Sequence, residues 1–194
     1  MPKLKRYYYL QEDVVAVAKD LLGKTLITHL NGKLTSGIIT ETEAYAGVND
    51  KASHSYGGKR TARNEVMYRN GGTGYVYLCY GLHHLFNVVT NKEDVPHAVL
   101  IRALKPLAGI ETILKRRKHK TIAKNTSGGP GTVSQALGIT TKLNGEDLTG
   151  KKIWLQDEGI KILKQNIIAG PRVGVDYAGE DAKLPYRFIL EINH

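Results

Sequence analysis

Glu41, Glu43 and Tyr45 occupy every second position of the segment ETEAYAG, in a chain with a large excess of positive charge. Side chains of an extended strand alternate between its two faces, so these three would project from one face. The two carboxylates would then lie about 7 Å apart, a separation found in inverting glycosidases. Those carboxylates approach a sugar from opposite sides, whereas neighbours on one strand point the same way. We therefore expect at most one of them to do chemistry, and the spacing alone favours two solvent-facing residues.

Tyrosine is the second unusual feature, because the chain has 11 Tyr but only 2 Phe and 1 Trp. A tyrosine offers a ring face on which a base can stack and a hydroxyl that can form hydrogen bonds. Tyr75, Tyr77 and Tyr80 fall in one expected strand and its turn. We expect Tyr75 to be a half-buried sheet residue. Tyr80 precedes Gly81 at an expected hairpin tip, where burial in the core is disfavoured.

The charge of the chain favours a polyanionic partner. It carries 28 Lys and Arg against 18 Asp and Glu, a formal net charge of +10. Each phosphate that such a protein neutralises releases condensed counterions, so nucleic acid is the first candidate, ahead of a membrane surface or an acidic protein. The run KRRKHK at 115–120 is typical of a solvated helix face and does not by itself indicate a DNA contact. No phosphate-loop motif GxxxxGK[ST] occurs.

The cysteine content and the N-terminus indicate the compartment. Cys79 is the single cysteine, so no internal disulfide can form, and no Cys/His spacing resembles a zinc site. The N-terminal segment MPKLKRYYYL lacks the apolar core and cleavage site of a signal peptide. The longest apolar region, YVYLCYGLHHLF, is too short and too polar to span a bilayer. We expect a cytoplasmic protein without a membrane segment.

The elements that must position these residues follow from the pattern of the chain. Asn31-Gly32 is typical of a two-residue hairpin turn, and it separates two expected strands, the second of which carries ETEAYAG. The segment 46–74 has no sustained periodicity and is expected to be mostly loop. A sharp turn is expected at 127–131. The expected helices cover 12–22, 107–119 and 132–139, and the expected strands cover 24–30, 33–45, 74–81, 85–91, 97–107, 152–156 and parts of 161–179 and 186–193. Residues 1–194 are predicted to form a single compact α+β domain around a mixed, mainly antiparallel sheet with flanking helices.

Five motifs in order make the chain similar to a known family. They are ETEAYAG, KASHS, YVYLCYG with Asn87 seven residues beyond Tyr80, VLIRALKPLAGIE, and RVGVDYAG. Together they closely resemble the alkyladenine type of 3-methyladenine DNA glycosylase over about residues 8 to 190. The resemblance implies a curved sheet with a protruding hairpin, action on double-stranded DNA as a monomer, and no metal or other cofactor.

The resemblance also implies a reaction. Proteins of this family flip alkylated or deaminated purines out of duplex DNA, among them 3-methyladenine, 7-methylguanine, hypoxanthine and ethenoadenine. They hydrolyse the N-glycosidic bond with water as the nucleophile and leave an abasic site. By this resemblance Glu43 is the general base that activates the water. Arg102 helps to hold that water, and Val173 adds its backbone carbonyl.

The same resemblance assigns a pocket for the flipped base. The purine would lie between Tyr45 and His54 on one side and Tyr77 on the other. Asn87 would border the pocket and discriminate against the exocyclic amino group of guanine. Tyr80 would be the wedge that enters the minor groove and fills the space left by the extruded nucleotide.

Two alternatives remain open at this stage. A non-catalytic nucleic-acid-binding domain would keep the fold and the charge, and Glu43 would be dispensable in it. A hydrolase of small nucleosides would need neither Tyr80 nor the basic surface.

Overall fold

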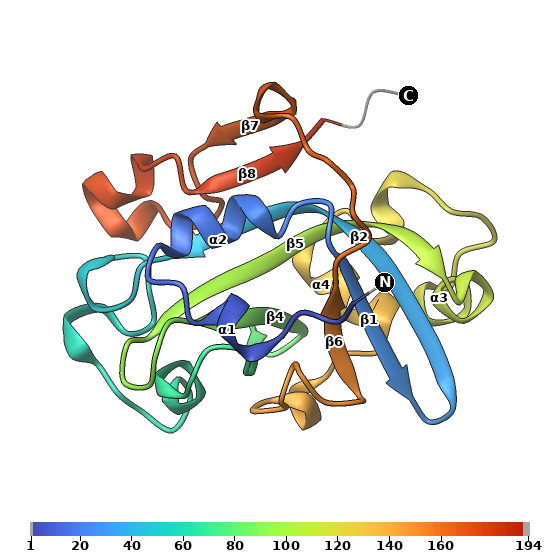
Figure 1. Cartoon of the computed structure of the whole chain (residues 1–194), viewed down its shortest axis with the longest axis horizontal. Coiled ribbons are helices and arrows are strands. Elements are labelled where there is room, and N and C mark those ends of the chain that lie inside the picture. The colour runs from blue at the N-terminus through green and yellow to red at the C-terminus, as the bar shows by residue number, and fades with distance from the viewer. Residues whose placement is uncertain (1, 192–194) are drawn as a thin grey trace.

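The computed structural model describes residues 2–191, and its centre is an eight-stranded sheet. The strands follow the order β3-β4-β5-β2-β1-β6, with β8 beside β2 and β7 beside β8 (Figure 1). All pairings between these strands are antiparallel. The strands are β1 (Thr25–Leu30), β2 (Lys33–Tyr45), β3 (Gly74–Cys79), β4 (His83–Thr90), β5 (His97–Ala108), β6 (Ile153–Gln156), β7 (Ile167–Gly170) and β8 (Arg187–Leu190). The predicted α+β fold is confirmed. The last two residues of the expected strand 186–193 lie outside the described residues.

Four short α-helices and several 3-10 turns surround the sheet. Glu43 and Thr42 lie on opposite faces of β2, and the Thr42 hydroxyl donates to the Ala18 carbonyl of α2 at 2.7 Å. In Figure 1, α2 lies in front of β2 and β5, whereas α4 lies behind them. The α-helices are α1 (Arg6–Tyr9), α2 (Val14–Asp20), α3 (Ile110–Arg117) and α4 (Pro130–Leu137).

Strand β2 has 13 residues and is paired along both edges at residues 36–38 and 41–43. Strand β5 occupies one edge. The other edge is shared by β1, which pairs with residues 33–38, and β8, which pairs with residues 41–43. This long shared strand carries the residues of the ETEAYAG motif, so its position is fixed by three neighbours.

A bulge in β5, opposite Glu41 and Thr42 of β2, sets the direction of Arg102. Glu41 pairs with Ala103, but the residue after it pairs with Ile101, so Arg102 falls between two pairs. Bulges bend a strand and re-aim its side chains. The Arg102 guanidinium consequently forms ion pairs with both Glu41 and Glu43. The expectation that the two glutamates share a face is confirmed.

Most expected elements occur with shifted ends, and the shifted starts of the helices have local causes. The helix expected at 12–22 begins at Val14, because Asp13 caps it by accepting from the N–H groups of Val15 and Ala16. The helix expected at 107–119 begins at Ile110, because β5 continues to Ala108.

Two further differences concern the loops. The helix expected to start at residue 132 starts at Pro130, since proline suits the first turn of a helix and its missing N–H costs nothing there. The expected loop at 46–74 contains three short 3-10 helices, η1 (Gly47–Asn49), η2 (Tyr56–Gly58) and η3 (Glu65–Tyr68). Both central residues of the Asn31-Gly32 turn have positive φ, at 50° and 70°, as a type I′ turn requires.

Two arginines of the KRRKHK run make internal contacts, which a purely solvated helix face would not. Arg116 donates to the Ala136 carbonyl of α4 and to the Thr35 hydroxyl, each at 3.1 Å. Arg117 donates to the Thr126 carbonyl at 2.8 Å. These two side chains therefore hold α3 against α4 and the loop before it.

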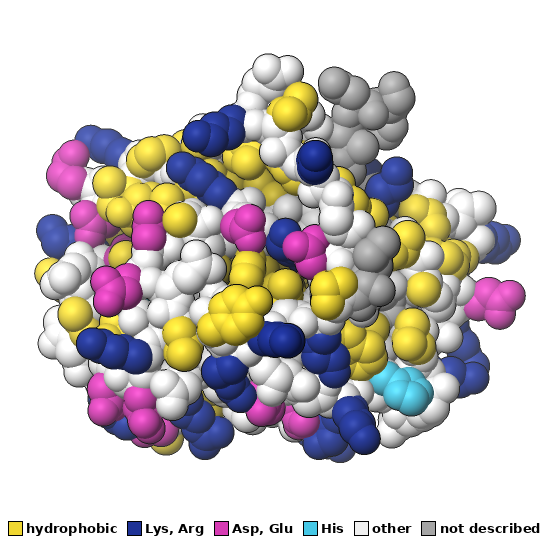
Figure 2. Space-filling view, viewed as in Figure 1, with side chains coloured by type: hydrophobic (Ala, Val, Ile, Leu, Met, Phe, Trp, Pro, Cys, Tyr) yellow, Lys and Arg dark blue, Asp and Glu magenta, His cyan; other side chains and the backbone are white. Residues whose placement is uncertain are grey.

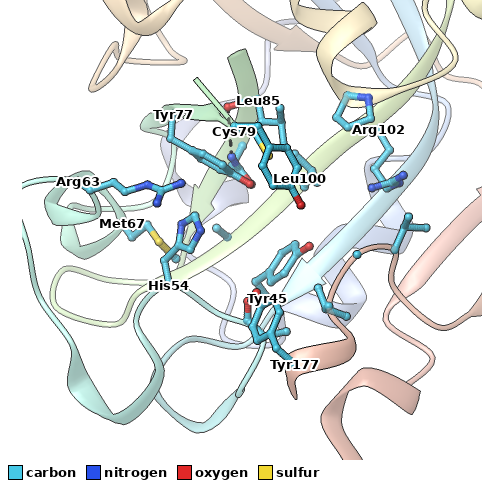
Figure 3. Close-up of a pocket in the computed structure, with 18 residues that line it drawn as sticks. Tyr45, His54, Arg63, Met67, Tyr77, Cys79, Leu85, Leu100, Arg102 and Tyr177 are labelled. Atoms are coloured by element: carbon cyan, nitrogen blue, oxygen red, sulfur yellow. Dashed lines mark hydrogen bonds between the residues drawn. The ribbon is translucent and has the colours of Figure 1, made fainter. Parts of the chain in front are cut away.

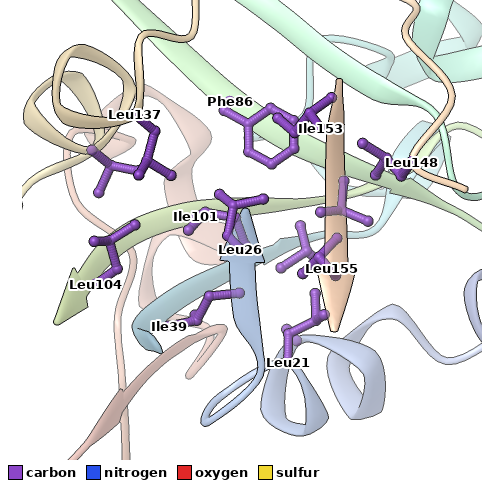
Figure 4. Packing of buried hydrophobic residues seen from close by; sticks show 14 of the residues in the cluster. Leu21, Leu26, Ile39, Phe86, Ile101, Leu104, Leu137, Leu148, Ile153 and Leu155 are labelled. Atoms are coloured by element: carbon purple, nitrogen blue, oxygen red, sulfur yellow. The ribbon is translucent and has the colours of Figure 1, made fainter. Parts of the chain in front are cut away.

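Apolar side chains from the helices and the central strands form the main core, part of which Figure 4 shows. Leu21 after α2, Leu137 of α4, Phe86 of β4 and Ile101 of β5 are all 0% exposed. Burying one such side chain stabilises a protein by about 1.5–3 kcal/mol. This packing fixes β2 and β5 relative to each other.

The face seen in Figure 2 carries Lys and Arg side chains interspersed with Asp and Glu. It is the face on which α2 lies. Within residues 2–191, no helix combines the length and the apolar character needed to cross a membrane.

Gly109 provides a test of the junction between β5 and α3. Gly109 and Gly32 both have a φ of 70°, but a Cβ at Gly109 would lie 2.2 Å from the Leu34 carbonyl oxygen, whereas a Cβ at Gly32 would meet nothing within 4 Å. Gly32→Ala should cost about 1–2 kcal/mol through its backbone angle alone. Gly109→Ala should cost about 1–3 kcal/mol more, because the backbone must shift to relieve the clash. Urea unfolding of both variants measures the difference, and equal losses would contradict it.

Candidate active site

Glu43 is fully buried, and its side chain is 0% exposed. Its Oε1 accepts from the Val173 backbone N–H at 2.8 Å, and its Oε2 accepts from the Tyr45 hydroxyl at 2.9 Å. The Arg102 Nη1 lies 3.3 Å from the same Oε2. The arrangement favoured by spacing alone, two solvent-facing glutamates, is therefore wrong for Glu43.

Burying a carboxylate costs free energy unless it is paired and hydrogen-bonded. Tyr45, Val173 and Arg102 provide these interactions for Glu43. A carboxylate has about four acceptor positions. One acceptor position of Glu43 is therefore left for a further donor. A buried, multiply bonded carboxylate beside a cavity is a typical feature of active sites.

Glu41 holds the arginine that faces Glu43. Its Oε1 accepts from Arg102 Nε at 2.8 Å and from Arg187 Nε at 2.6 Å, and its side chain is 12% exposed. Burial of Arg102 opposes its charge, but the charges of Glu43 and Glu41 outweigh burial and raise the pKa of Arg102. Glu41 is thus an electrostatic neighbour that fixes the Arg102 fork.

A cavity of about 490 Å³ lies in front of this cluster (Figure 3). It is lined by seven of the eight residues proposed from the sequence, namely Tyr45, His54, Tyr77, Tyr80, Asn87, Arg102 and Val173. Glu43 does not line it. The carboxylate lies one layer behind the wall, in contact with three of the lining residues.

Aromatic rings surround the cavity. The His54 and Tyr77 rings contact each other edge to face, with centroids 4.7 Å apart. A base that stacks between them must therefore separate them. Burial, with a smaller contribution from Glu43, raises the pKa of Tyr45, so Tyr45 remains a protonated donor to Glu43.

His54 is held neutral. Its Nδ1 shares a hydrogen bond of 2.9 Å with the hydroxyl of Tyr75, which is 1% exposed and more deeply buried than expected. Burial lowers the pKa of His54 to about 4, and the charges of Arg63 and Lys59 add to this effect. An uncharged imidazole therefore faces the cavity at neutral pH.

Asn87 is buried at the cavity wall, 3% exposed. Its Nδ2 donates to the Tyr75 carbonyl at 3.2 Å, which fixes the side chain against β3. Tyr80 lies at the tip of the β3–β4 hairpin, as predicted, and is 91% exposed. Tyr80 and Gly81 both have positive φ, at 51° and 70°.

Arg63 and Tyr177 also line the cavity, although they are not among the eight residues proposed from the sequence; Tyr177 belongs to the motif RVGVDYAG, whereas Arg63 had no signal in the sequence. The Arg63 guanidinium lies over the Tyr77 ring, 5.1 Å from its centroid. Tyr177 is 70% exposed at the rim, and its hydroxyl donates to the Ala52 carbonyl at 3.2 Å. Arg63 comes from the irregular segment 46–74, where no periodicity could place it. No group of three potential metal-ligating His, Cys, Asp or Glu side chains occurs among residues 2–191.

An aromatic cavity backed by a buried carboxylate, beside an exposed tyrosine on a hairpin tip, is typical of enzymes that act on a nucleic-acid base outside the helix. The family model described as methylpurine-DNA glycosylase (MPG) matches residues 8–194, and the chain belongs to that family. The resemblance identified from five motifs is confirmed, and with it the enzyme class, a DNA glycosylase.

Relatives match the chain over almost its whole length. A protein of Chlamydia felis (strain Fe/C-56) is 46% identical over 97% of this chain and 96% of its own length. One of Desulfitobacterium hafniense (strain Y51) is 46% identical over 98% and 96%. One of Bacillus cereus (strain AH820) is 45% identical over 94% and 93%. Each bears the name "Putative 3-methyladenine DNA glycosylase".

The neutral state of His54 predicts a pH dependence of folding. The His54 pKa falls from 6.5 to about 4 on folding, so between these values the unfolded chain binds a proton that the folded protein does not. Stability should therefore decrease as the pH is lowered through this window, by on the order of 2 kcal/mol. In His54→Gln this contribution should disappear. Urea unfolding of both proteins near pH 7 and near pH 4.5 measures it, and the same pH dependence in both would contradict the assignment.

Proposed function

We propose that the chain is a monofunctional DNA glycosylase that removes alkylated or deaminated purines from duplex DNA by hydrolysing the N-glycosidic bond, leaving an abasic site. Residues 1–194 act as one catalytic domain and as a monomer. Family membership supports the reaction class. The observation that carries the mechanism is Glu43, buried with three donors directly behind the aromatic cavity.

Glu43 is the proposed general base. Its remaining acceptor position takes a hydrogen bond from water and then the proton, and its charge stabilises the oxocarbenium character of the sugar in the transition state. Arg102 holds the water from the opposite side, and the Val173 carbonyl accepts its second hydrogen. Glu41 supports this role of Arg102, because the hydrogen bond of 2.8 Å from Arg102 Nε to Glu41 Oε1 fixes the position of the guanidinium.

Water must first reach Glu43, which the wall of Tyr45, Arg102 and Val173 separates from the cavity. Catalytic contacts in free enzymes are often incomplete and tighten only with substrate bound. We infer that entry of the nucleotide displaces the Tyr45 hydroxyl from Glu43, which frees a second acceptor position.

The pocket suits a base with a positive charge. N3- and N7-alkylated purines are cationic, so they are good leaving groups and are attracted to electron-rich ring faces. Tyr45 and Tyr77 offer such faces. A protonated histidine would repel this base, and the pKa of about 4 keeps His54 uncharged at neutral pH.

Asn87 is proposed to select among purines. Its amide is fixed against the Tyr75 carbonyl, so it cannot turn away from a base that enters the cavity. The exocyclic amino group of guanine would meet this fixed wall, whereas hypoxanthine and adenine derivatives lack that group. Normal guanine would be disfavoured, whereas 7-methylguanine, which has the same amino group, would still be removed because its positive charge makes it a better leaving group.

Tyr80 is proposed to hold the duplex open. Extruding a nucleotide costs a few kcal/mol of stacking and pairing, which a side chain inserted into the vacated space can offset. Tyr80 is almost fully exposed at a hairpin tip beside the cavity, where such an insertion needs no rearrangement of the core. The formal charge of +10 supplies the general attraction to phosphates.

Glu43→Gln tests the enzyme and its base together. The enzyme is incubated in excess with duplexes containing one hypoxanthine or 1,N6-ethenoadenine, or with DNA carrying 7-methylguanine, and alkali then breaks each abasic site. Glu43→Gln should reduce single-turnover excision by about 100-fold or more, because the base is lost, while DNA binding changes little.

Glu41→Gln is the matched control for that experiment. It changes the neighbouring carboxylate in the same way, and the loss should be much smaller because Glu41 acts only through Arg102. Equal losses would mean that the wrong carboxylate was assigned. Wild-type protein that breaks none of these duplexes would support a non-catalytic nucleic-acid-binding domain instead.

Tyr80→Ala tests the wedge and the nucleoside-hydrolase alternative. Excision from duplex DNA should fall at least about tenfold, because the vacated space is no longer filled. Tyr7→Ala is the control, since Tyr7 is also exposed, at 74%, but lies outside the cavity. Unchanged excision by Tyr80→Ala would favour an enzyme acting on free nucleosides.

A further inference from the structure

Arg172 is a buried arginine next to Val173, the residue whose backbone N–H contacts Glu43. Its side chain is 0% exposed. Its guanidinium forms a two-pronged ion pair with Asp50, in which Nη2 lies 2.8 Å from Oδ1. The same guanidinium donates to the Ala44 carbonyl at 2.9 Å and to the Asp181 carbonyl at 3.1 Å. It therefore joins its own segment to three other points of the chain.

Asp50, the partner of Arg172, also binds the backbone of its own loop. Its carboxylate also accepts from the backbone N–H of Ala46 at 2.9 Å and of Ala52 at 3.0 Å. These bonds close the η1 loop that leads from Tyr45 to His54. Burial opposes the charge of Arg172, but its hydrogen bonds and ion pair with Asp50 raise its pKa.

Arg172 also packs against the cavity wall. Its guanidinium carbon lies 4.9 Å from the centroid of the Tyr45 ring and 5.3 Å from that of Tyr186. Such cation–π contacts favour one position of the ring. The ring of Tyr45 is thus supported from behind by the cation that also anchors Val173.

The segment around Val173 depends on this anchor. Residues 171–174 belong to no helix or strand, and among residues 2–191 no turn or loop hydrogen bond between backbone groups holds them. Val173 is 49% exposed and Gly174 has a φ of 74°. The contacts that fix this segment are the Arg172 side chain and the Val173 N–H bond to Glu43.

We propose that Arg172, through Asp50, is a positioning residue for the reaction: it holds the Val173 N–H on Glu43 and the Tyr45 ring at the cavity wall. This inference rests on the proposed function. Arg172 touches neither the cavity nor Glu43 with its side chain, so it acts through its neighbours. A small displacement of such a support can lower a reaction rate by about 10–100-fold.

Arg172→Lys is the test, because lysine keeps the charge but cannot form the two-pronged contact. Arg6→Lys is the matched control. Arg6 likewise joins a carboxylate, Asp147, to a backbone carbonyl, that of Gly71, each at 2.8 Å, but it lies outside the cavity.

Two quantities are measured on each protein. The first is amide hydrogen exchange of residues 172–175, which include the Val173 N–H that bonds to Glu43. The second is the single-turnover excision rate with saturating enzyme, together with the Kd for the lesion duplex. Arg172→Lys should accelerate exchange and lower the rate about tenfold or more, with Kd changed less than about threefold. Arg6→Lys should change neither exchange nor rate.

The outcomes separate this inference from the proposed function. Unchanged exchange in Arg172→Lys, or faster exchange with an unchanged rate, would overturn it. A wild-type protein inactive on every lesion would refute the proposed function, while exchange would still decide whether Arg172 holds Val173. If Arg172→Lys does not fold, Asp50→Asn removes the partner charge instead, and the same two measurements apply.

Discussion

The burial of one carboxylate is the constraint around which this molecule is arranged. Glu43 has no contact with solvent, so every stabilising interaction for its charge must come from the protein. Its three donors come from three places: its own strand, strand β5 and the segment after β7. The sheet brings the first two together. The third is the residue that follows Arg172.

The donors to Glu43 differ in how firmly the fold holds them. Strand β2 is paired on both edges, and the bulge beside Glu41 turns Arg102 toward the glutamates. These are features of a rigid framework, supported by a core of fully buried side chains. The donor from Val173 instead lies on an irregular segment, next to the buried ion pair of Arg172 and Asp50. One of the three contacts of Glu43 therefore comes from outside the paired strands.

Much of this arrangement could be predicted from the sequence. The period of two in ETEAYAG placed Glu41, Glu43 and Tyr45 on one face, and the order of five motifs identified the family. What could not be predicted depends on distant contacts. One donor to the buried Glu43 carboxylate is the N–H of Val173, 130 residues away along the chain. Arg63 comes from a segment without periodicity, and the low pKa of His54 results from burial that no local pattern encodes.

The turn at Tyr80 has a consequence for association. A non-glycine residue with positive φ is strained by about 1 kcal/mol or more, and the hairpin imposes that conformation in the free protein. The energetic cost therefore falls on folding, before DNA is met. In the proposed wedge role of Tyr80, this backbone strain adds no further cost on binding, so more of the contact energy of the ring remains available for affinity.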